Sequence, residues 1–294
     1  MFSILIPTYN FDVYKLVHNV HTQLNDNKIN FEIIVFEDGS KEFENKIKDL
    51  KNVEIIYNEE NIGRVKARQF LAKKAKYDWL IFLDADVIPK RNHFILNYLN
   101  ATLLDYDVVF GGFAYYQTKP GNDYLLRWKY GKEQEEVFAF KRNKTPYKII
   151  ISANYMIKKT VFNAINFQMN AKGYGYDNYY GALLKQYNTK VLHIDNEVYH
   201  LGIEKSRIYL KKKEQAAITL LKLLKEENIT VHDNQLLGLY LNLKKFKSIF
   251  LLSGIYRLFS GLMKKNLTGN NPSIKILQLY RISFMCYISK NDIV

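Results

Sequence analysis

Cysteine is almost absent from the sequence, since Cys286 is the only one in 294 residues. A single thiol cannot form an internal disulfide, so the chain is not a disulfide-stabilised secreted scaffold. It cannot build a cysteine-based zinc site either, which excludes a zinc-finger protein. The N-terminus also lacks the basic start and long apolar stretch of a secretory signal. We therefore expect a protein of a reducing compartment, the cytoplasm.

Proline, glycine and long hydrophobic runs are scarce as well. With 5 Pro, 14 Gly and 48% hydrophobic residues, the chain is neither collagen-like nor mucin-like nor disordered as a whole. Its longest apolar stretch, residues 248–263, is interrupted by Arg257 and falls short of the roughly 20 residues that a membrane-spanning helix needs. Length and composition predict a globular chain with one large α/β domain or two small ones.

Positive charge is concentrated in the last third of the chain. The formal net charge is +14, and residues 205–294 contribute +11 of it, with 16 Lys and Arg against 5 Asp and Glu. A near-neutral front with a basic, aromatic-rich tail is typical of a chemical domain joined to a segment that binds an anionic surface, either a membrane or a nucleic acid. Only eight of the 43 basic residues are Arg. A Lys- and Asn-rich codon bias is therefore an alternative explanation that needs no partner.

The first 83 residues alternate between apolar runs and segments with helical spacing. Four apolar runs have the length and composition of buried parallel strands: residues 2–6, 31–36, 53–57 and 79–83. Helical patterns lie between them at residues 14–24 and 64–75. This order predicts the α/β class, with a doubly wound, mostly parallel central sheet flanked by helices and connected by right-handed crossovers.

Polar segments follow three of these predicted strands, at residues 7–10, 37–40 and 84–86. In a doubly wound sheet the ligand binds at the carboxyl ends of the strands, so the three segments should meet at one crevice. Asp84 and Asp86 supply hard oxygen ligands that suit Mn²⁺ or Mg²⁺ bridging a diphosphate. Taken alone, this Asp-x-Asp pattern fits a solvated turn better than a metal site, because such residues are common in loops.

The pattern becomes less regular after residue 86. Further strands are expected at residues 107–114, 147–157 and 189–194, a polar excursion at 122–145, a helix within 172–190, and helices from 209 onward. An apolar stripe flanked by lysines occupies residues 244–265. Such a helix either lies in the headgroup layer of an anionic membrane or packs on the rest of the protein with its lysines in water.

Several motifs in chain order together resemble the family 2 glycosyltransferases with the GT-A fold. They are Ile6-Pro7-Thr8-Tyr9-Asn10, Glu37-Asp38-Gly39-Ser40, Asn61-Ile62-Gly63-Arg64 through Arg68, Leu83-Asp84-Ala85-Asp86, Ser152-Ala153-Asn154, Gly173-Tyr174-Gly175-Tyr176-Asp177-Asn178 and Val198-Tyr199-His200. The resemblance covers about residues 1–205. No P-loop pattern or dinucleotide fingerprint occurs, which argues against an ATPase or a dehydrogenase.

The resemblance implies a nucleotide-diphosphate-sugar donor, expected to be a UDP-sugar. Its nucleotide-binding residues would be Pro7, Thr8, Tyr9, Asn10, Asp38, Gly63, Arg64, Arg68 and Asp84. Asp38 would accept the imide proton of the base, and the two arginines would lie near the ribose or the diphosphate. As free-standing residues, Arg64 and Arg68 also fit a solvated helix face.

The resemblance also implies that Asp86 and His200 bind the metal, Mn²⁺ or Mg²⁺, since neutral imidazole is an acceptable ligand. The alternative for His200 is a purely structural histidine. His193, at the end of a predicted strand, is expected to pack inside the fold.

The sequence departs from the family at Asp177-Asn178, where relatives usually carry Glu-Asp. The second carboxylate of that pair is generally the base that deprotonates the acceptor hydroxyl, which an Asn cannot do. We assign the base to Asp177, which predicts inverting transfer. A base elsewhere, a retaining mechanism and a weak or inactive relative remain open. Asn154, Tyr176 and Asn178 are expected to bind the acceptor.

We therefore expect a metal-dependent glycosyltransferase that moves a sugar from a nucleotide-diphosphate donor to a glycan or lipid-linked acceptor in bacterial surface polysaccharide synthesis. The GT-A catalytic domain should span residues 1–205, with a nucleotide-binding half 1–110 and an acceptor half 111–205, and a basic, mainly helical extension should span 206–294. The expected location is the cytoplasm, peripheral at the inner face of the membrane if the tail binds lipid. The alternatives are an inactive nucleotide-sugar or glycan-binding subunit and, less favoured, a nucleic-acid binder, so no nucleic-acid partner is expected.

Overall fold

The computed structural model describes residues 1–41, 47, 50–166, 174–226, 229 and 231–291, and contacts divide the chain into two units. The first, here called the sheet unit, comprises residues 1–114, 136–172 and 186–202. The second, the helical unit, comprises residues 115–135, 173–185 and 203–294. The units do not follow chain order, because two segments from the predicted acceptor half belong to the helical unit.

The sheet unit contains ten strands and five helices within the described residues. The strands are β1 (Phe2–Thr8), β2 (Phe31–Asp38), β3 (Val53–Asn58), β4 (Trp79–Leu83), β5 (Val87–Pro89), β6 (Val108–Phe110), β7 (Phe113–Ala114), β8 (Asn154–Lys158), β9 (Val191–His193) and β10 (Val198–His200). The helices are α1 (Tyr14–Asp26), α2 (Arg64–Lys74), α3 (Phe94–Ala101), α5 (Ala139–Arg142) and α6 (Lys159–Asn166).

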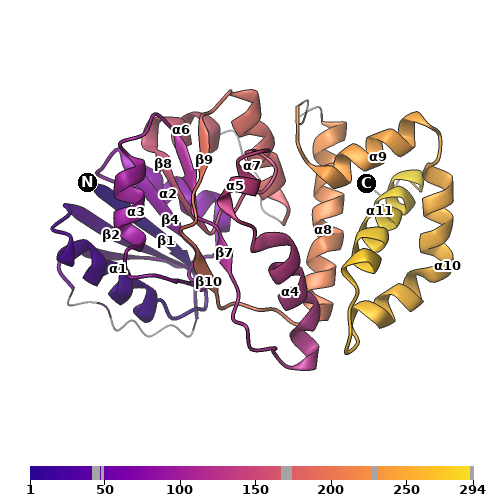
Figure 1. Ribbon diagram of the computed structural model, residues 1–294, viewed down its shortest axis with the longest axis horizontal. Coiled ribbons are helices and arrows are strands. Elements are labelled where there is room, and N and C mark those ends of the chain that lie inside the picture. The colour runs from indigo at the N-terminus through magenta and orange to yellow at the C-terminus, as the bar shows by residue number, and fades with distance from the viewer. Residues whose placement is uncertain (42–46, 48–49, 167–173, 227–228, 230, 292–294) are drawn as a thin grey trace. The chain divides into compact units, whose positions relative to one another are not determined.

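Seven strands form the central sheet in the order β3-β2-β1-β4-β8-β6-β9 (Figure 1). The strands β1 to β4 pair in parallel, which confirms the prediction for the first 83 residues. The chain winds outward from β1 to β3 and then returns to place β4 on the other side of β1. Only β8 runs antiparallel to its neighbours, so the sheet is mostly parallel, as expected. A second, small sheet has the order β5-β10-β7.

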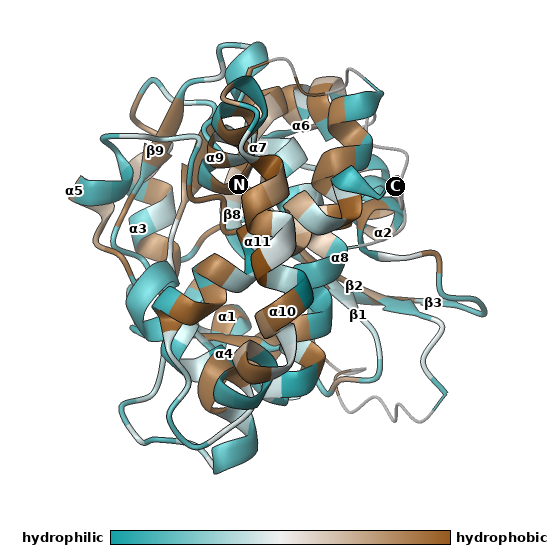
Figure 2. Ribbon diagram, turned by 90° about the vertical axis from the view of Figure 1, so that its right-hand side faces the viewer, coloured by the Kyte–Doolittle hydropathy of each residue, from teal (hydrophilic) through white to brown (hydrophobic). Residues whose placement is uncertain are grey.

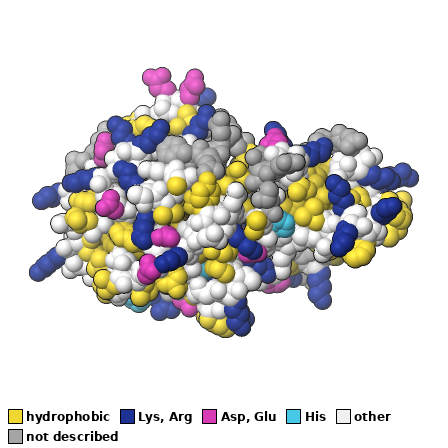
Figure 3. Space-filling view, turned by 90° about the horizontal axis from the view of Figure 1, so that it is seen from above, with side chains coloured by type: hydrophobic (Ala, Val, Ile, Leu, Met, Phe, Trp, Pro, Cys, Tyr) yellow, Lys and Arg dark blue, Asp and Glu magenta, His cyan; other side chains and the backbone are white. Residues whose placement is uncertain are grey.

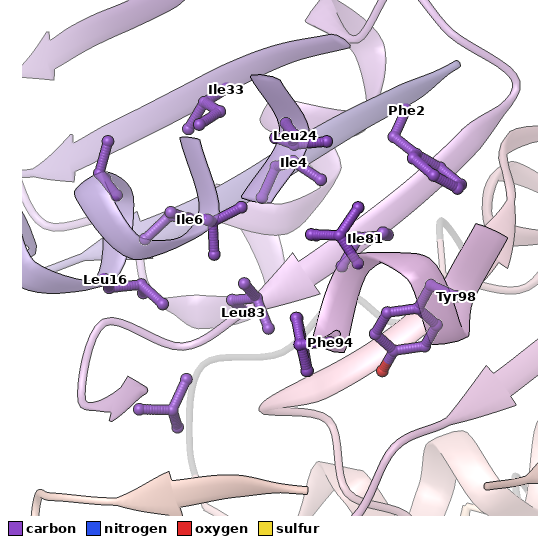
Figure 4. Packing of buried hydrophobic residues seen from close by; sticks show 14 of the residues in the cluster. Phe2, Ile4, Ile6, Leu16, Leu24, Ile33, Ile81, Leu83, Phe94 and Tyr98 are labelled. Carbon is purple, nitrogen blue, oxygen red and sulfur yellow. The ribbon is translucent and has the colours of Figure 1, made fainter. Parts of the chain in front are cut away.

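Both faces of the central sheet are covered by helices, which is why its strands read as continuous apolar runs. On one face, side chains of β1, β2 and β4 form a buried cluster with those of α1 and α3. Figure 4 shows these members of the cluster: Phe2, Ile4, Ile6, Leu16, Leu24, Ile33, Ile81, Leu83, Phe94 and Tyr98. On the other face, the rings of Phe82 and Phe162 stack with centroids 4.8 Å apart, which places α6 there.

The predicted strand at residues 107–114 is wrong in one respect, because it is two strands in different sheets. The break falls at Gly111 and Gly112, between β6 and β7. A Cβ atom at Gly111 would lie 2.4 Å from Nδ2 of Asn154, and Gly112 has a φ of +99°, a conformation that favours glycine. The backbone therefore turns at the glycine pair and leaves the central sheet.

Other boundaries in this half also differ from the prediction. The strand expected at residues 147–157 begins only at Asn154, as β8, and the predicted polar excursion contains α4 (Leu125–Tyr130) and α5. The short strands β5 and β10 were not predicted, because three residues show no periodicity.

The helical unit also contains the 3₁₀ helix η1 (Asn122–Tyr124), the π-helical turn η2 (Gly131–Glu135), α7 (Tyr176–Gln186) up to Lys185, α8 (Ser206–Lys225), α9 (Gln235–Lys245), α10 (Ile249–Leu267) and α11 (Ile274–Lys290). Its core includes Leu126 of α4, Tyr209 of α8, Leu267 of α10 and Leu277 of α11. Among the described residues no single helix has the length and apolar character of a membrane span. Taken together, α9 and α10 have that length and apolar character, but they are bent by 116° relative to each other.

A buried hydrogen-bond network surrounds Arg142 and His193 in the sheet unit. Arg142 donates from Nε to the carbonyl of Val137 at 2.9 Å and from Nη1 to Nδ1 of His193 at 2.8 Å. Since an arginine only donates, Nδ1 must accept, and Nε2 of His193 donates to the carbonyl of Pro146 at 2.8 Å. Burial, reinforced by the charge of Arg142, lowers the pKa of His193 to about 4 against the effect of the Pro146 bond. His193 is thus a neutral packing residue, as expected.

The neutral state of His193 predicts that the protein loses stability in mild acid. An ordinary histidine has a pKa of about 6.5, so between pH 6.5 and 4 the unfolded chain binds a proton here that the folded chain does not. Stability should therefore fall as the pH drops through this window, by up to about 3 kcal/mol from this one group. Urea unfolding at several pH values between 7.5 and 4.5 measures the loss.

Two variants separate this effect from general acid unfolding. His193→Gln can still accept the Arg142 bond but does not titrate, so its stability should depend less on pH. His18→Gln, at an exposed histidine of the same unit, should keep the pH dependence of the parent. An identical pH slope in His193→Gln and the parent would contradict the assignment.

Candidate active site

The loops after β1 and β2 are joined to each other at the carboxyl edge of the sheet. The backbone N–H of Asn10 donates to Oγ of Ser40, and the N–H of Lys41 donates to Oδ1 of Asn10 at 3.3 Å. Ser40 in turn donates to Glu37. Asn10 has a φ of +50°, a left-handed conformation that asparagine tolerates better than most residues. The two predicted nucleotide-binding loops therefore lie side by side.

The turn after β1 buries one predicted residue and exposes the next. Thr8 is buried and donates from Oγ1 to the carbonyl of Phe11 at 3.0 Å, which closes the turn. Tyr9 is 53% exposed, and Pro7 is half-buried. The Tyr9 ring is thus available for stacking, whereas Thr8 maintains the shape of the loop.

Asp38 holds the loop that leads into α2. Its carboxylate accepts from the backbone N–H of Ile62 at 2.7 Å and of Gly63 at 2.9 Å. Gly39 packs so closely on this loop that a Cβ atom there would lie 2.6 Å from the backbone nitrogen of Asn61. A carboxylate has about four acceptor positions, so two bonds leave capacity for the imide of a base.

Arg68 is buried and binds Asp84 directly. Its Nη2 lies 2.5 Å from Oδ1 of Asp84 and donates to the carbonyl of Ser152 at 2.9 Å. Arg64 is more distant, with Nη1 3.9 Å from Oδ2 of Asp84 and a side chain 52% exposed. Arg68 is therefore not on a solvated helix face, and only Arg64 has the exposure that contact with a bound diphosphate requires.

Asp84 stays ionised because of these arginines. Burial by itself would raise the pKa of Asp84, but the charges of Arg68 and Arg64 and the hydrogen bond from Arg68 outweigh it and lower this pKa below its ordinary value. Asp84 thus joins β4 to α2 through a charged bond, and through Arg68 to the segment that precedes β8.

The small sheet brings Asp86 and His200 together. In the antiparallel pair of β5 and β10, Val87 lies opposite His200, and the N–H of Leu201 donates to the carbonyl of Asp86 at 2.8 Å. As a result, Oδ2 of Asp86 lies 3.4 Å from Nε2 of His200. The two side chains are 31% and 12% exposed, respectively. A carboxylate oxygen and an imidazole nitrogen at this separation could share one divalent metal with modest adjustment.

Asp86 and His200 alone could not complete the coordination of a metal. In the described ranges, no three His, Cys, Asp or Glu side chains gather closely enough to hold a metal by themselves. A metal held by Asp86 and His200 would take its remaining ligands from a diphosphate or water, which fits a cation that binds together with its substrate.

Sequence reasoning missed two residues that shape the site. A Cβ atom at Gly202 would lie 2.0 Å from Oδ2 of Asp86, so any side chain at this position would displace that carboxylate. Glu37 is buried, and burial raises its pKa against the effect of hydrogen bonds with Ser40. Gly202 stands two residues after His200 in the sequence, but only the fold shows that it touches Asp86.

The acceptor-binding prediction for Asn154 is not supported by its surroundings. The residue is 0% exposed. Its Nδ2 donates to the carbonyls of Gly112 and Asn196, at 3.0 and 2.9 Å, and its Oδ1 accepts from the hydroxyl of Tyr98 at 2.7 Å. Because both amide atoms are used inside the fold, Asn154 is a structural residue at the start of β8.

The other residues predicted for catalysis and acceptor binding, Tyr176, Asp177 and Asn178, lie at the start of α7, in the helical unit. Asp177 is a half-buried residue in the first turn of this helix, and Tyr176 is half-buried beside it. Asn178 donates from Nδ2 to the carbonyl of Gly175 at 3.2 Å and accepts at Oδ1 from Asn234, which caps α9, at 2.6 Å. The amide of Asn178 is thus a link between two helices. Gly173 of the predicted motif lies outside the described residues.

Comparison with known proteins identifies the relatives of the chain. Residues 3–165, more than half of the sequence, match the family described as Glycosyl transferase family 2. The chain is 28% identical over 182 residues to Glycosyltransferase GlyG of Streptococcus pneumoniae serotype 4, covering 57% of this chain and 60% of GlyG. An uncharacterized glycosyltransferase of Haemophilus influenzae is 37% identical over 89 residues, 29% of each chain. The chain therefore matches less than two thirds of the length of these curated relatives.

Two solved structures share the fold. S. aureus TarS in complex with UDP-GlcNAc has a TM-score of 0.53 at 14% sequence identity, covering 99% of this chain and 91% of that chain. The mannosyltransferase PcManGT from Pyrobaculum calidifontis, in complex with GDP-Man and Mn²⁺, has a TM-score of 0.55 at 12% identity, covering 99% and 86%. At these identities the likeness concerns the fold alone, and it confirms the predicted GT-A fold.

The ion pair between Arg68 and Asp84 should contribute more to stability than any other interaction of Arg64 or Arg68. Replacing Arg68 by Met should destabilise the protein by about 3 kcal/mol, because it leaves the Asp84 carboxylate, whose side chain is only 14% exposed, without its nearest partner. The matched variant Arg64→Met should cost less than about 1 kcal/mol, since Arg64 is half-exposed and 3.9 Å from the carboxylate. Urea unfolding at neutral pH compares them.

A double variant tests whether the unpaired charge of Asp84 causes the loss of stability. Adding Asp84→Asn to Arg68→Met removes the unpaired charge and should restore part of the lost stability. Two results would contradict this role of the ion pair. One is an equal loss of unfolding free energy in Arg68→Met and Arg64→Met. The other is a loss in the double variant that exceeds the sum of the losses in Arg68→Met and Asp84→Asn alone.

Proposed function

Because the chain belongs to glycosyl transferase family 2, we propose that it is a metal-dependent glycosyltransferase that moves a sugar from a nucleotide-diphosphate donor to a glycan or lipid-linked acceptor. The observation that carries the proposal is the position of Asp86 and His200, 3.4 Å apart, next to the ionised Asp84 at the carboxyl ends of parallel strands. The expected setting is the synthesis of a bacterial surface polysaccharide.

For the donor we propose a UDP-sugar held by the loops after β1 and β2. The exposed ring of Tyr9 would stack on the base, and the carboxylate of Asp38 would accept the imide proton of uracil through its remaining lone pairs. Arg64, with a side chain 52% exposed, would reach the diphosphate. Relatives in fold bind different nucleotides, UDP-GlcNAc in TarS and GDP-Man in PcManGT, so the base has to be tested.

For the cofactor we propose Mn²⁺ or Mg²⁺ bound by Asp86 and His200. When bound, such a cation would neutralise the charge of the departing diphosphate. Gly202 keeps the carboxylate of Asp86 facing His200, because any side chain at 202 would displace it. Arg68 donates a hydrogen bond to Asp84, two residues before Asp86, and keeps Asp84 ionised.

For the chemical step we propose that Asp177 deprotonates the acceptor hydroxyl, which corresponds to inverting transfer. The neighbouring Asn178 has no basic group, and its amide is bonded to Gly175 and Asn234. That same amide favours a second candidate function, a nucleotide-sugar-binding subunit without transferase activity. Hydrolysis of the donor in the presence of metal separates the two candidates, because only an active enzyme turns it over.

Donor binding should depend on the metal and on Asp86. We expect calorimetry to show UDP binding in Mn²⁺ that is weakened at least about tenfold both by EDTA and by Asp86→Asn, since each removes the bridge to the diphosphate. The control Asp105→Asn changes an exposed carboxylate of the same unit and should bind UDP like the parent.

Equal affinity for UDP with and without metal would contradict the metal bridge. Repeating the titrations with GDP, ADP and CDP tests the base separately, and tighter binding of GDP than of UDP would show that the uridine assignment is wrong.

The role of Asp177 predicts that binding and chemistry can be separated. Asp177→Asn should reduce kcat at least about 10²-fold, the lower range for loss of a general base, and leave the affinity for UDP unchanged. The control Asp123→Asn alters another carboxylate at a helix start of the helical unit and should keep the parent kcat. Undiminished turnover in Asp177→Asn would place the base elsewhere.

The variant Asn178→Asp complements this test. A carboxylate at 178 can still accept the bond from Asn234, so the variant should fold. Little change in kcat agrees with a base at Asp177, whereas a large gain would show that position 178 is the proper place of the base.

A further inference from the structure

The outer face of α10 exposes large apolar side chains. Phe250, Leu251, Leu258 and Leu262 are 58%, 55%, 71% and 67% exposed. Their spacing places them on one side of the helix, while Met263 and Leu267 point into the core of the helical unit. Figure 2 shows hydrophobic and hydrophilic residues along this same helix. We call these four residues, with Phe246 just before the helix at 72% exposure, the α10 stripe.

Nothing polar interrupts the middle of the stripe. Gly254 and Gly261 lie on the same side of the helix as the four apolar residues, and a Cβ atom at either would meet no atom within 4 Å. The surface is thus open and apolar over more than two turns. Soluble monomers rarely expose a continuous apolar area of this kind unless something binds it.

Positive charge borders the stripe, and the acidic contact that the structure gives one of these cations is the ion pair of Lys264 with Glu214 of α8, 3.4 Å apart. Lys244, Lys245 and Lys247 are exposed at one end, and Arg257, Lys264 and Lys265 are exposed beside it. Residues 234–291 contain nine Lys and Arg and not one Asp or Glu. In Figure 3, hydrophobic and Lys/Arg side chains lie next to each other at the right-hand end, where Figure 1 draws α10.

This combination of charges selects among possible occupants. A second copy of the chain placed stripe to stripe would bring these cations against one another, which costs free energy. A bilayer with anionic lipids matches both features of this surface. Its negative phosphates lie at the depth of the headgroups, where they can pair with the cations, and its hydrocarbon lies just below, where the apolar stripe can insert.

We propose that α10 binds flat on the surface of an anionic phospholipid bilayer. Its 19 residues extend for about 28 Å along the membrane plane. The α10 stripe enters the boundary between headgroups and acyl chains, and the bordering lysines and Arg257 contact lipid phosphates. The opposite side of α10 remains packed in the helical unit, so the helix lies on the membrane and does not span it.

This inference goes beyond the proposed function, because lipid binding requires neither donor nor metal. It corresponds to the alternative, left open by the sequence, in which the basic tail binds lipid at the inner membrane face. A protein bound there could meet a lipid-linked acceptor without dissociating from the membrane.

Flotation of the full chain with vesicles tests the proposal. We expect binding to vesicles of phosphatidylcholine with phosphatidylglycerol, little binding to phosphatidylcholine alone, and weaker binding as salt is raised. The double variant Phe250→Ser with Leu258→Ser should weaken binding at least about tenfold, because two membrane-inserted side chains are lost. Both positions are exposed, so the variant should fold. The control Leu103→Ser with Leu104→Ser removes two residues that are 84% and 50% exposed in the sheet unit and should bind like the parent.

Three outcomes would overturn the inference: no binding to any vesicle, equal binding by the stripe variant and the parent, or a dimer in sedimentation velocity that the stripe variant abolishes. The last would assign the stripe to a second copy of the chain. UDP calorimetry on the same samples reports the donor site independently, so failure of lipid binding and failure of the proposed function are distinguishable.

Discussion

The ion pair of the buried Arg68 with Asp84 is the interaction on which the rest of the candidate site depends. It connects α2 to the end of β4, and the bond from Arg68 to the carbonyl of Ser152 adds the segment before β8. With Asp84 held in this way, the turn that follows has a defined course, and Asp86 emerges from it toward His200. One arginine therefore keeps a neighbouring carboxylate ionised and orients the carboxylate that we propose for the metal.

Backbone groups provide much of the remaining preorganisation. The carboxylate of Asp38 accepts from two backbone N–H groups at the entry to α2, and the pairing of β5 with β10 determines the distance between Asp86 and His200. Gly202 completes this arrangement by leaving space for the carboxylate of Asp86. Because little side-chain freedom remains to be lost, a donor and its metal would bind to residues that already face each other.

The helical unit carries different physical features from the sheet unit. Asn178 uses its amide to join the start of α7 to the cap of α9, which accounts structurally for an amide beside Asp177. The exposed apolar side chains of α10 lie outside the core of the helical unit, and lysines border them. If both proposals hold, one unit binds the donor and the other binds the membrane that carries a lipid-linked acceptor.

The sequence by itself determined the four parallel strands and the strand ends that carry Asp38 and Asp84, because buried strands and their polar ends leave local patterns. It indicated the GT-A fold through the resemblance of its motifs to those of family 2 glycosyltransferases. Only the tertiary structure decided that Arg68 is buried against Asp84 and that Asn154 is enclosed by Gly112, Asn196 and Tyr98. It also decided the pairing of the three-residue strands β5 and β10, which are too short to show periodicity. The physical reason is that these features depend on contacts between segments far apart in the chain, and such contacts leave no periodic signal in any one of them.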